Sequence, residues 1–216
     1  MNYQQFEAYL AKGFTNEAII SILSPYIRPE RQQKIDAVLD ARVPSVTVAL
    51  EQPSDIHNAL AVVRTAEAFG VDELHLIAPE GNARSGWNTS KGAMNWVRVH
   101  YHAGLCDLGP ALKQRCFVLA GAAMEGSQPL DTLPKDRPLC LILGNEHRGL
   151  SEEARSACDV LYHIPMVGMS ESLNLSVAAG ISLASVTAGR RRGYSEDERA
   201  KRRAWYFIRA NPDRLV

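Results

Sequence analysis

The sequence lacks the cysteine patterns that would indicate a disulfide framework or a metal site. Its 216 residues include only four cysteines, and no two of them form a C-x-x-C pair. A reduced cysteine in an apolar run behaves as a small hydrophobic residue. No segment reaches the roughly 18 apolar residues of a membrane span, and the first residues, MNYQQFEAYLAKGF, lack the apolar centre of a signal peptide. We therefore expect a protein of the reducing cytoplasm, with no metal and no membrane partner.

The chain also lacks a net formal charge, because its 24 Lys and Arg residues balance its 24 Asp and Glu residues. The distribution is uneven, since residues 190–216 hold nine basic residues against four acidic ones. Trp205, Tyr206 and Phe207 lie within this basic tail. Such a tail can follow a phosphate backbone while it offers rings to bases. It can equally be an amphipathic helix that packs its aromatic rings on a protein surface, and both interpretations stay open.

The apolar pattern predicts an α/β protein. Residues 3–42 have helical periodicity that Pro25 and Pro29 interrupt. Beyond them, short strand candidates alternate with helical segments. The strand candidates are residues 45–50, 74–78, 97–101, 116–120, 139–143 and 160–164, and the helical candidates are residues 57–69, 108–114 and 151–158. This alternation is typical of a mostly parallel sheet with helices on both faces.

In open α/β sheets, ligands bind outside the carboxyl ends of the strands. Three loops after predicted strands are unusual, and they begin at Gly121, Gly144 and Pro165. The second loop lies in LILGNEHRGLS, residues 141–151, where Ser151 is a suitable N-cap for the next helix. Its G-x-x-x-x-G spacing is that of a phosphate-binding loop, but Leu150 stands where that loop needs lysine, which argues against an ATPase.

Single residues in these segments admit a functional and an ordinary interpretation. Glu146 is a functional carboxylate or a plain surface residue. Arg64, inside an apolar helix, is explained when taken alone by a salt bridge to Glu67 three residues later. Ser170, Ser172 and Asn174 precede a helix of mostly small residues, and N-capping explains only one of the three.

Other catalytic patterns are missing. His100 and His102 alternate on a predicted strand, but no third ligand lies nearby in the sequence, so we expect no metal site. The chain contains no G-x-S-x-G, no H-E-x-x-H and no G-x-G-x-x-G after a first strand. A hydrolase of the nucleophile-elbow type, a zinc protease and a dinucleotide-dependent oxidoreductase are therefore disfavoured.

Three segments, taken in order, resemble the three motifs of the SpoU/TrmH methyltransferases. They are N-x5-R-T-A at residues 58–66, LILGNEHRGLS, and IPMVGMSESLNLSVAA, which begins at Ile164. The third is the most specific, because it is long and has no generic structural cause. The resemblance covers residues 34–192 and includes TSKGAMNWV at residues 89–97.

The resemblance implies a fold, a cofactor and an assembly. The family's α/β domain threads its C-terminal segment through a trefoil knot, binds S-adenosyl-L-methionine there and forms a homodimer through the knot region. Knots are too rare for periodicity to predict. The expected organisation is therefore an N-terminal helical extension (1–42), a knotted methyltransferase domain (43–192) and a basic helical tail (193–216).

The resemblance also assigns roles to residues by position. The residues expected to bind the cofactor are Gly121, Gly144, Ile164, Met169 and Leu173. Arg64 corresponds to the family's catalytic arginine. The residues that complete the polar set around it are Asn58, Glu146, Ser172 and Asn174.

The implied reaction is methylation of an RNA ribose 2′-hydroxyl. S-Adenosyl-L-methionine carries an activated methyl group, so the protein must mainly align the hydroxyl and help remove its proton. Family models give proton removal to the arginine, yet an arginine is effectively always protonated. As an alternative, Arg64 binds an RNA phosphate.

The neighbourhood of the first motif resembles the enzymes that methylate guanosine 18 in the tRNA D-loop. We therefore expect tRNA as the substrate, with ribosomal RNA or another tRNA position as the alternative. A knotted RNA-binding factor without catalysis is the alternative from another class. The intact Arg64, Glu146, Ser172 and Asn174 argue against that factor.

Overall fold

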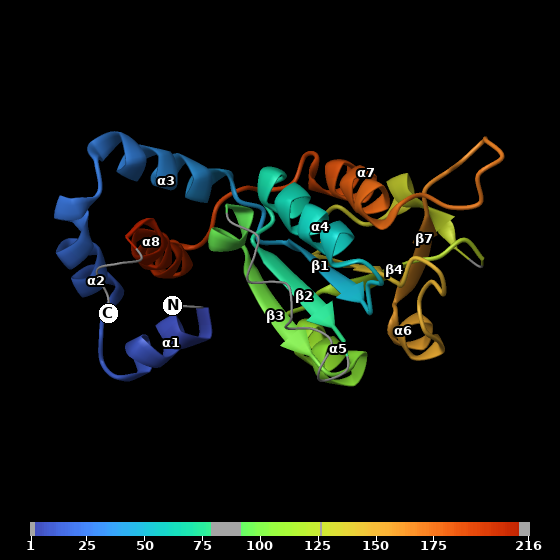
Figure 1. The fold of residues 1–216 in the computed structure, drawn as a ribbon, viewed down its shortest axis with the longest axis horizontal. Helices are drawn as coiled ribbons and strands as arrows, with labels where there is room; N and C mark the ends of the chain where they lie inside the picture. The colour runs from blue at the N-terminus through green and yellow to red at the C-terminus, as the bar shows by residue number, and fades with distance from the viewer. Residues whose placement is uncertain (1–2, 79–91, 126, 212–216) are drawn as a thin grey trace. The chain divides into compact units, whose positions relative to one another are not determined.

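The computed structural model describes residues 3–78, 92–125 and 127–211 (Figure 1). Of the expected TSKGAMNWV segment, residues 89–91 lie outside this range. The chain forms two compact units, one of residues 43–191 and one that combines the described residues before Val43 with those after Arg191. The two chain ends thus share a unit, and the domain boundaries expected from the sequence stay a prediction.

The central unit is built on a parallel sheet of seven strands in the order β3-β2-β1-β6-β4-β7-β5. The strands are β1 Val46–Glu51, β2 Glu73–Ile77, β3 Arg98–His102, β4 Val118–Ala122, β5 Gln128–Pro129, β6 Leu139–Leu143 and β7 Val160–His163. The prediction of a mostly parallel sheet is confirmed. The six predicted strands are all present, while β5, with two residues, was not predicted.

Helices cover both faces of this sheet, as the sequence predicts (Figure 1). On one face lie α4 (Ile56–Ala68) and α7 (Leu175–Thr187), and on the other lie α5 (Leu105–Gln114) and α6 (Glu152–Ala157). Local capping explains where two of them begin. Asp55 accepts a hydrogen bond from the N–H of His57 at the start of α4, and Ser151 accepts one from the N–H of Ala154 at the start of α6.

The small residues of α7 let it pack closely in the unit. A Cβ at Gly180 would lie 3.6 Å from Cγ2 of Thr65 on α4, so the two helices nearly touch there. Ser182 is buried, and its Oγ accepts a hydrogen bond of 3.0 Å from the hydroxyl of Tyr162 on β7. This close packing agrees with the helix of mostly small residues that the sequence predicts after Asn174. The trefoil knot that the resemblance implies is consistent with this fold and stays a prediction.

The terminal unit is helical. It contains α1 (Tyr3–Ala11), α2 (Asn16–Leu23), α3 (Pro29–Ala41) and α8 (Glu196–Ala210), with a short 3-10 turn that includes Pro25 before α3. The predicted breaks at the two prolines are confirmed. Trp205 on α8 is buried against the rings of Tyr3 and Phe6, with centroids at 5.3 Å and 5.6 Å.

The basic residues of α8 are paired inside the same unit. Arg199 bonds Asp40 at 2.7 Å and Asp36 at 3.2 Å, and Lys201 lies 3.0 Å from Glu7. The hydrogen bond from Arg199 holds the pKa of Asp40 below its usual value. Of the two interpretations left open for the basic tail, the structure supports the packed amphipathic helix, because the aromatic rings of α8 are buried and four of its cations form salt bridges.

A histidine cluster lies on neighbouring positions of β2 and β3. Nδ1 of His75 lies 3.0 Å from Nε2 of His102, and the ring of His75 stacks on that of His100 with centroids 5.3 Å apart. The structure thus adds a third histidine to the pair seen in the sequence. Even so, the part of the chain that is described contains no group of three or more ligand side chains placed to hold a metal ion.

This cluster makes stability depend on pH. Burial lowers the pKa of His100 from 6.5 to about 4. Between these values the unfolded chain binds more protons, so His100 destabilises the fold increasingly as the pH falls from 6.5 towards 4, by up to about 3 kcal/mol. Urea unfolding at pH 7 and at pH 4.5 measures the loss. The His100→Gln variant should lose much less stability over this interval, and an equal loss in both proteins would contradict the assignment.

Candidate active site

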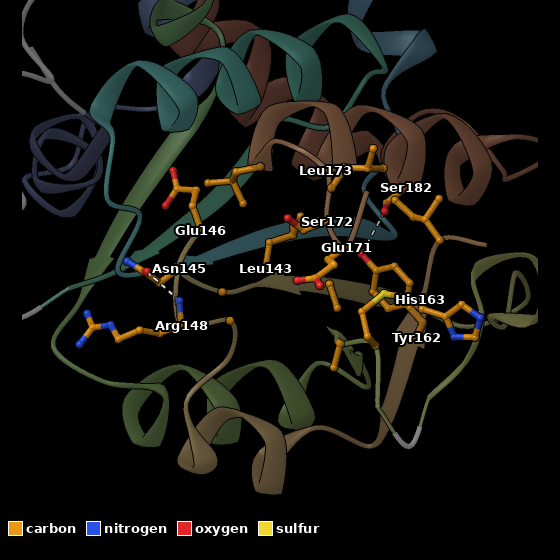
Figure 2. Close-up of a pocket in the computed structure, with 18 of the residues that line it drawn as sticks. Leu143, Asn145, Glu146, Arg148, Tyr162, His163, Glu171, Ser172, Leu173 and Ser182 are labelled. Carbon is orange, nitrogen blue, oxygen red and sulfur yellow. Dashed lines mark hydrogen bonds between the residues drawn. The ribbon is translucent and has the colours of Figure 1, made fainter. Parts of the chain in front are cut away.

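A pocket opens at the carboxyl ends of β4, β6 and β7 (Figure 2). Its volume is about 450 Å³, within the range of pockets that hold small-molecule cofactors. Its walls come from residues 122–124, 143–149 and 162–164, together with residues 171–173 before α7. Loops after predicted strands do form the pocket, as expected from the parallel sheet.

The loop after β6 can form only with glycine at its first position. A Cβ on Gly144 would lie 2.2 Å from the carbonyl carbon of Gly149 and 2.3 Å from its oxygen. The loop is closed by two backbone hydrogen bonds between Asn145 and Gly149, at 3.0 Å and 2.8 Å, and Gly149 has a φ of +68°. Gly149 therefore supplies the left-handed conformation of the turn, and Gly144 supplies the room for it.

A hydrogen-bond network joins three of the polar residues that the resemblance singles out. The carboxylate of Glu146 accepts hydrogen bonds from Nδ2 of Asn58 at 3.0 Å and from the N–H and Oγ of Ser54, both at 2.7 Å. Nδ2 of Asn174 donates to Oδ1 of Asn58 at 3.0 Å. Residues from the end of β6, from α4 and from the start of α7 thus meet at one edge of the pocket.

These contacts fix the charge of Glu146. Partial burial raises the pKa of its carboxyl group, but the hydrogen bonds from Ser54 and Asn58 outweigh this effect and lower the pKa to about 2. Glu146 is therefore an anion at neutral pH and a very weak base. This geometry suits a group that orients amides, and it does not suit one that accepts a proton.

Asn174 has a second role as the N-cap of α7. Its Oδ1 accepts a hydrogen bond from the N–H of Ser176 at 2.9 Å and another from the hydroxyl of Ser176 at 2.6 Å. Capping therefore accounts for one member of the polar trio, as the sequence indicates. Ser172 lines the pocket, whereas Ser170 is exposed outside the pocket wall.

Three of the five residues expected to bind the cofactor line the pocket, and two do not. Gly144, Ile164 and Leu173 line the pocket, but Gly121 and Met169 do not. Gly121 lies inside β4, where a Cβ would meet Sγ of Cys158 at 2.7 Å, so close packing explains this glycine. The predicted loop start at Gly121 is wrong because the strand continues to Ala122. Met169 is fully exposed.

Some residues of the site carry no signal in the sequence alone. Ser54 holds Glu146, although 92 residues separate the two. Glu171 lines the pocket, and within the third motif no pattern sets it apart. Neither spacing nor periodicity distinguishes these two side chains from ordinary polar residues.

Arg64 lies away from this pocket. It is exposed on α4, six residues after Asn58, which places it about 9 Å further along the helix and on another side of it. It lines a separate hollow together with Leu60, Glu67 and Trp96. Within the described residues its guanidinium makes no salt bridge, so the pairing with Glu67 that the sequence suggested does not form.

Two curated relatives from different organisms carry the same name. The chain is 32% identical over 186 residues to the tRNA (guanosine(18)-2′-O)-methyltransferase of Escherichia coli, a match that covers 86% of this chain and 76% of the relative. It is 38% identical over 154 residues to the protein of the same name from Thermus thermophilus, covering 71% of this chain and 79% of the relative.

Solved structures share the fold. The TrmH/SpoU tRNA modifying enzyme of A. aeolicus has a TM-score of 0.72 and 27% identity, over 82% of this chain and 95% of that one. The SpoU methyltransferase AviRb of Streptomyces viridochromogenes, solved with AdoMet, has a TM-score of 0.59 and 24% identity, over 68% and 60% of the two chains, and shows the fold alone. The model of the SpoU rRNA Methylase family matches residues 45–184, and the chain belongs to this family.

Proposed function

We propose that this chain is an S-adenosyl-L-methionine-dependent RNA methyltransferase that methylates a ribose 2′-hydroxyl, with guanosine 18 of tRNA as its target. The observation that carries the proposal is the network of Asn58, Glu146 and Asn174 at the edge of a cofactor-sized pocket. The names of the two curated relatives support the choice of tRNA and of this nucleoside.

The pocket suits S-adenosyl-L-methionine in size and chemistry. Leu143, Ile164 and Leu173 offer apolar walls for the adenosine, and the bare backbone at Gly144 allows a close approach. These residues would hold the cofactor. When bound, the cofactor supplies a methyl group that its sulfonium already activates.

The polar residues would align the ribose. Glu146 is fixed by Ser54 and in turn orients the amide of Asn58, while Asn174 holds that amide from its other side. A fixed array of this kind raises the rate by holding the hydroxyl in line for attack. With a pKa of about 2, Glu146 does not take the hydroxyl proton. Arg64, always protonated, binds an RNA phosphate and lowers the cost of charge on the ribose oxygen.

The proposal includes a homodimer through α7. Val177 and Ile181, one turn apart on α7, are 48% and 40% exposed although both are apolar. An exposed apolar stripe on a helix suits burial against a second copy. Sedimentation velocity should find a dimer for the wild type and a monomer for Ile181→Glu. A monomeric wild type would contradict this part of the proposal.

Radiolabelled methyl transfer tests the activity. Unmodified tRNA and ribosomal RNA are supplied separately with labelled S-adenosyl-L-methionine, and the methylated ribose is then mapped. We expect label in tRNA at guanosine 18. Label in ribosomal RNA alone would overturn the substrate, and no label in either RNA would overturn the activity and favour a non-catalytic RNA-binding factor.

The two roles of Asn174 can be separated by two substitutions. Asn174→Asp keeps an oxygen that caps α7 but removes the N–H donor to Asn58. We expect it to stay within about 0.5 kcal/mol of the wild-type stability and to lose at least about tenfold in methyl transfer. Asn174→Ala should lose the same activity and about 1 kcal/mol of stability in addition.

Urea unfolding and the initial rate of methyl transfer give the two readouts. Full activity in Asn174→Asp would show that the bond to Asn58 is not needed for catalysis. Equal losses of stability in both variants would argue against the capping role.

A further inference from the structure

One carboxylate in the pocket wall, that of Glu171, has no hydrogen-bond or salt-bridge partner among the described residues. Glu171 precedes α7, and its exposed side chain lines the pocket (Figure 2). Among the described residues it makes no hydrogen bond and no ion pair. The other carboxylate of the wall, Glu146, is held by Ser54 and Asn58.

Two other polar side chains of the wall are also engaged. Arg148 donates a hydrogen bond to Oε1 of Gln52 at 3.3 Å. Nδ1 of His163 lies 2.8 Å from the hydroxyl of Ser127. Neither of these contacts includes Glu171, and no cation of the described residues forms an ion pair with it, so its charge is left to act on whatever the pocket holds.

The cofactor and its product differ in charge at one atom. S-Adenosyl-L-methionine has a sulfonium, an ammonium and a carboxylate, whereas S-adenosylhomocysteine has lost the sulfonium charge. A carboxylate near the sulfonium therefore stabilises the cofactor and leaves the product almost unaffected. A carboxylate near the ammonium would stabilise both molecules equally.

The position of Glu171 favours the sulfonium. Its neighbour Ser172 lines the pocket, and Asn174 belongs to the network that would orient the ribose hydroxyl. In the bound cofactor the methyl group would point at that hydroxyl, so the sulfonium that carries it would lie on the side of the pocket next to Asn174.

On the basis of the proposed function, we propose that Glu171 is the residue that distinguishes S-adenosyl-L-methionine from S-adenosylhomocysteine by charge. Its carboxylate faces the sulfonium and makes the pocket prefer the cofactor. After transfer this attraction is lost, which favours release of the product.

Calorimetric titration without RNA tests the proposal. Glu171→Gln keeps the shape of the side chain and removes its charge. We expect its affinity for S-adenosyl-L-methionine to fall by about fivefold, as for one screened charge pair near the surface, and its affinity for S-adenosylhomocysteine to change by less than about twofold. Glu152→Gln on α6, outside the pocket wall, is the matched control and should change neither affinity.

Equal losses for the two molecules would place the ammonium at Glu171 and overturn the proposal, and so would no loss for either. In a salt titration the wild type should lose affinity for the cofactor more steeply than Glu171→Gln. If the wild type binds neither molecule, the proposed function fails before the variant is compared, so the two failures can be told apart.

Discussion

Replacing Gly144 with alanine should lower the affinity for S-adenosyl-L-methionine by at least about 100-fold. The added Cβ would lie 2.2 Å from the carbonyl carbon of Gly149 and 2.3 Å from the N of Leu150. Both are backbone atoms, so the loop can admit the methyl only by opening the two hydrogen bonds between Asn145 and Gly149. The same loop lines the pocket and carries Glu146, and its movement would change the pocket and the polar network together.

Calorimetric titration with the cofactor measures this loss. Overpacking at Gly144 should also cost about 1–3 kcal/mol of stability, so thermal unfolding is recorded first and the titration is made well below the midpoint. Gly168→Ala is the control, because a Cβ there meets nothing within 4 Å. Gly168→Ala should bind the cofactor like the wild type. Wild-type affinity in Gly144→Ala would show that this loop does not hold the cofactor.

Replacing Arg64 with alanine should reduce methyl transfer by about 1000-fold, as when a charged group that acts in the transition state is removed. The affinity for the cofactor should stay within about twofold of the wild type, because Arg64 lies outside the pocket wall. Within the described residues the exposed guanidinium has no salt bridge to lose, so the fold should be little affected. Arg64→Lys should also lose most of the activity, since an ammonium cannot bind a phosphate through two parallel hydrogen bonds.

Steady-state methyl transfer gives kcat and KM for the RNA, and calorimetry gives the affinity for the cofactor. Arg155→Lys on α6 is the matched control, because Arg155 lies outside both hollows. If Arg64→Lys kept most of the activity, neither phosphate binding nor proton removal by this guanidinium could stand.

Local patterns in the sequence determined the layers of the central unit. Short apolar runs between helical segments predicted β1, β2, β3, β4, β6 and β7, and their parallel arrangement indicated the edge at which ligands bind. The caps at Asp55, Ser151 and Asn174 are local as well, since each acts on an N–H two or three residues away. The strand β5 escaped prediction because two residues carry no periodicity.

Only the tertiary structure decided which side chains meet. Periodicity reports the face that a residue presents, and it does not report the partner across space. The tail α8 could therefore be an RNA-binding arm or a packed helix until Arg199 was found 3.2 Å from Asp36, 163 residues away in the chain. The same reason applies to the polar network, in which Asn58 meets Glu146 from 88 residues away and Asn174 from 116 residues away. The motifs identified these residues, but they meet because the fold places α4, the loop after β6 and the start of α7 next to one another.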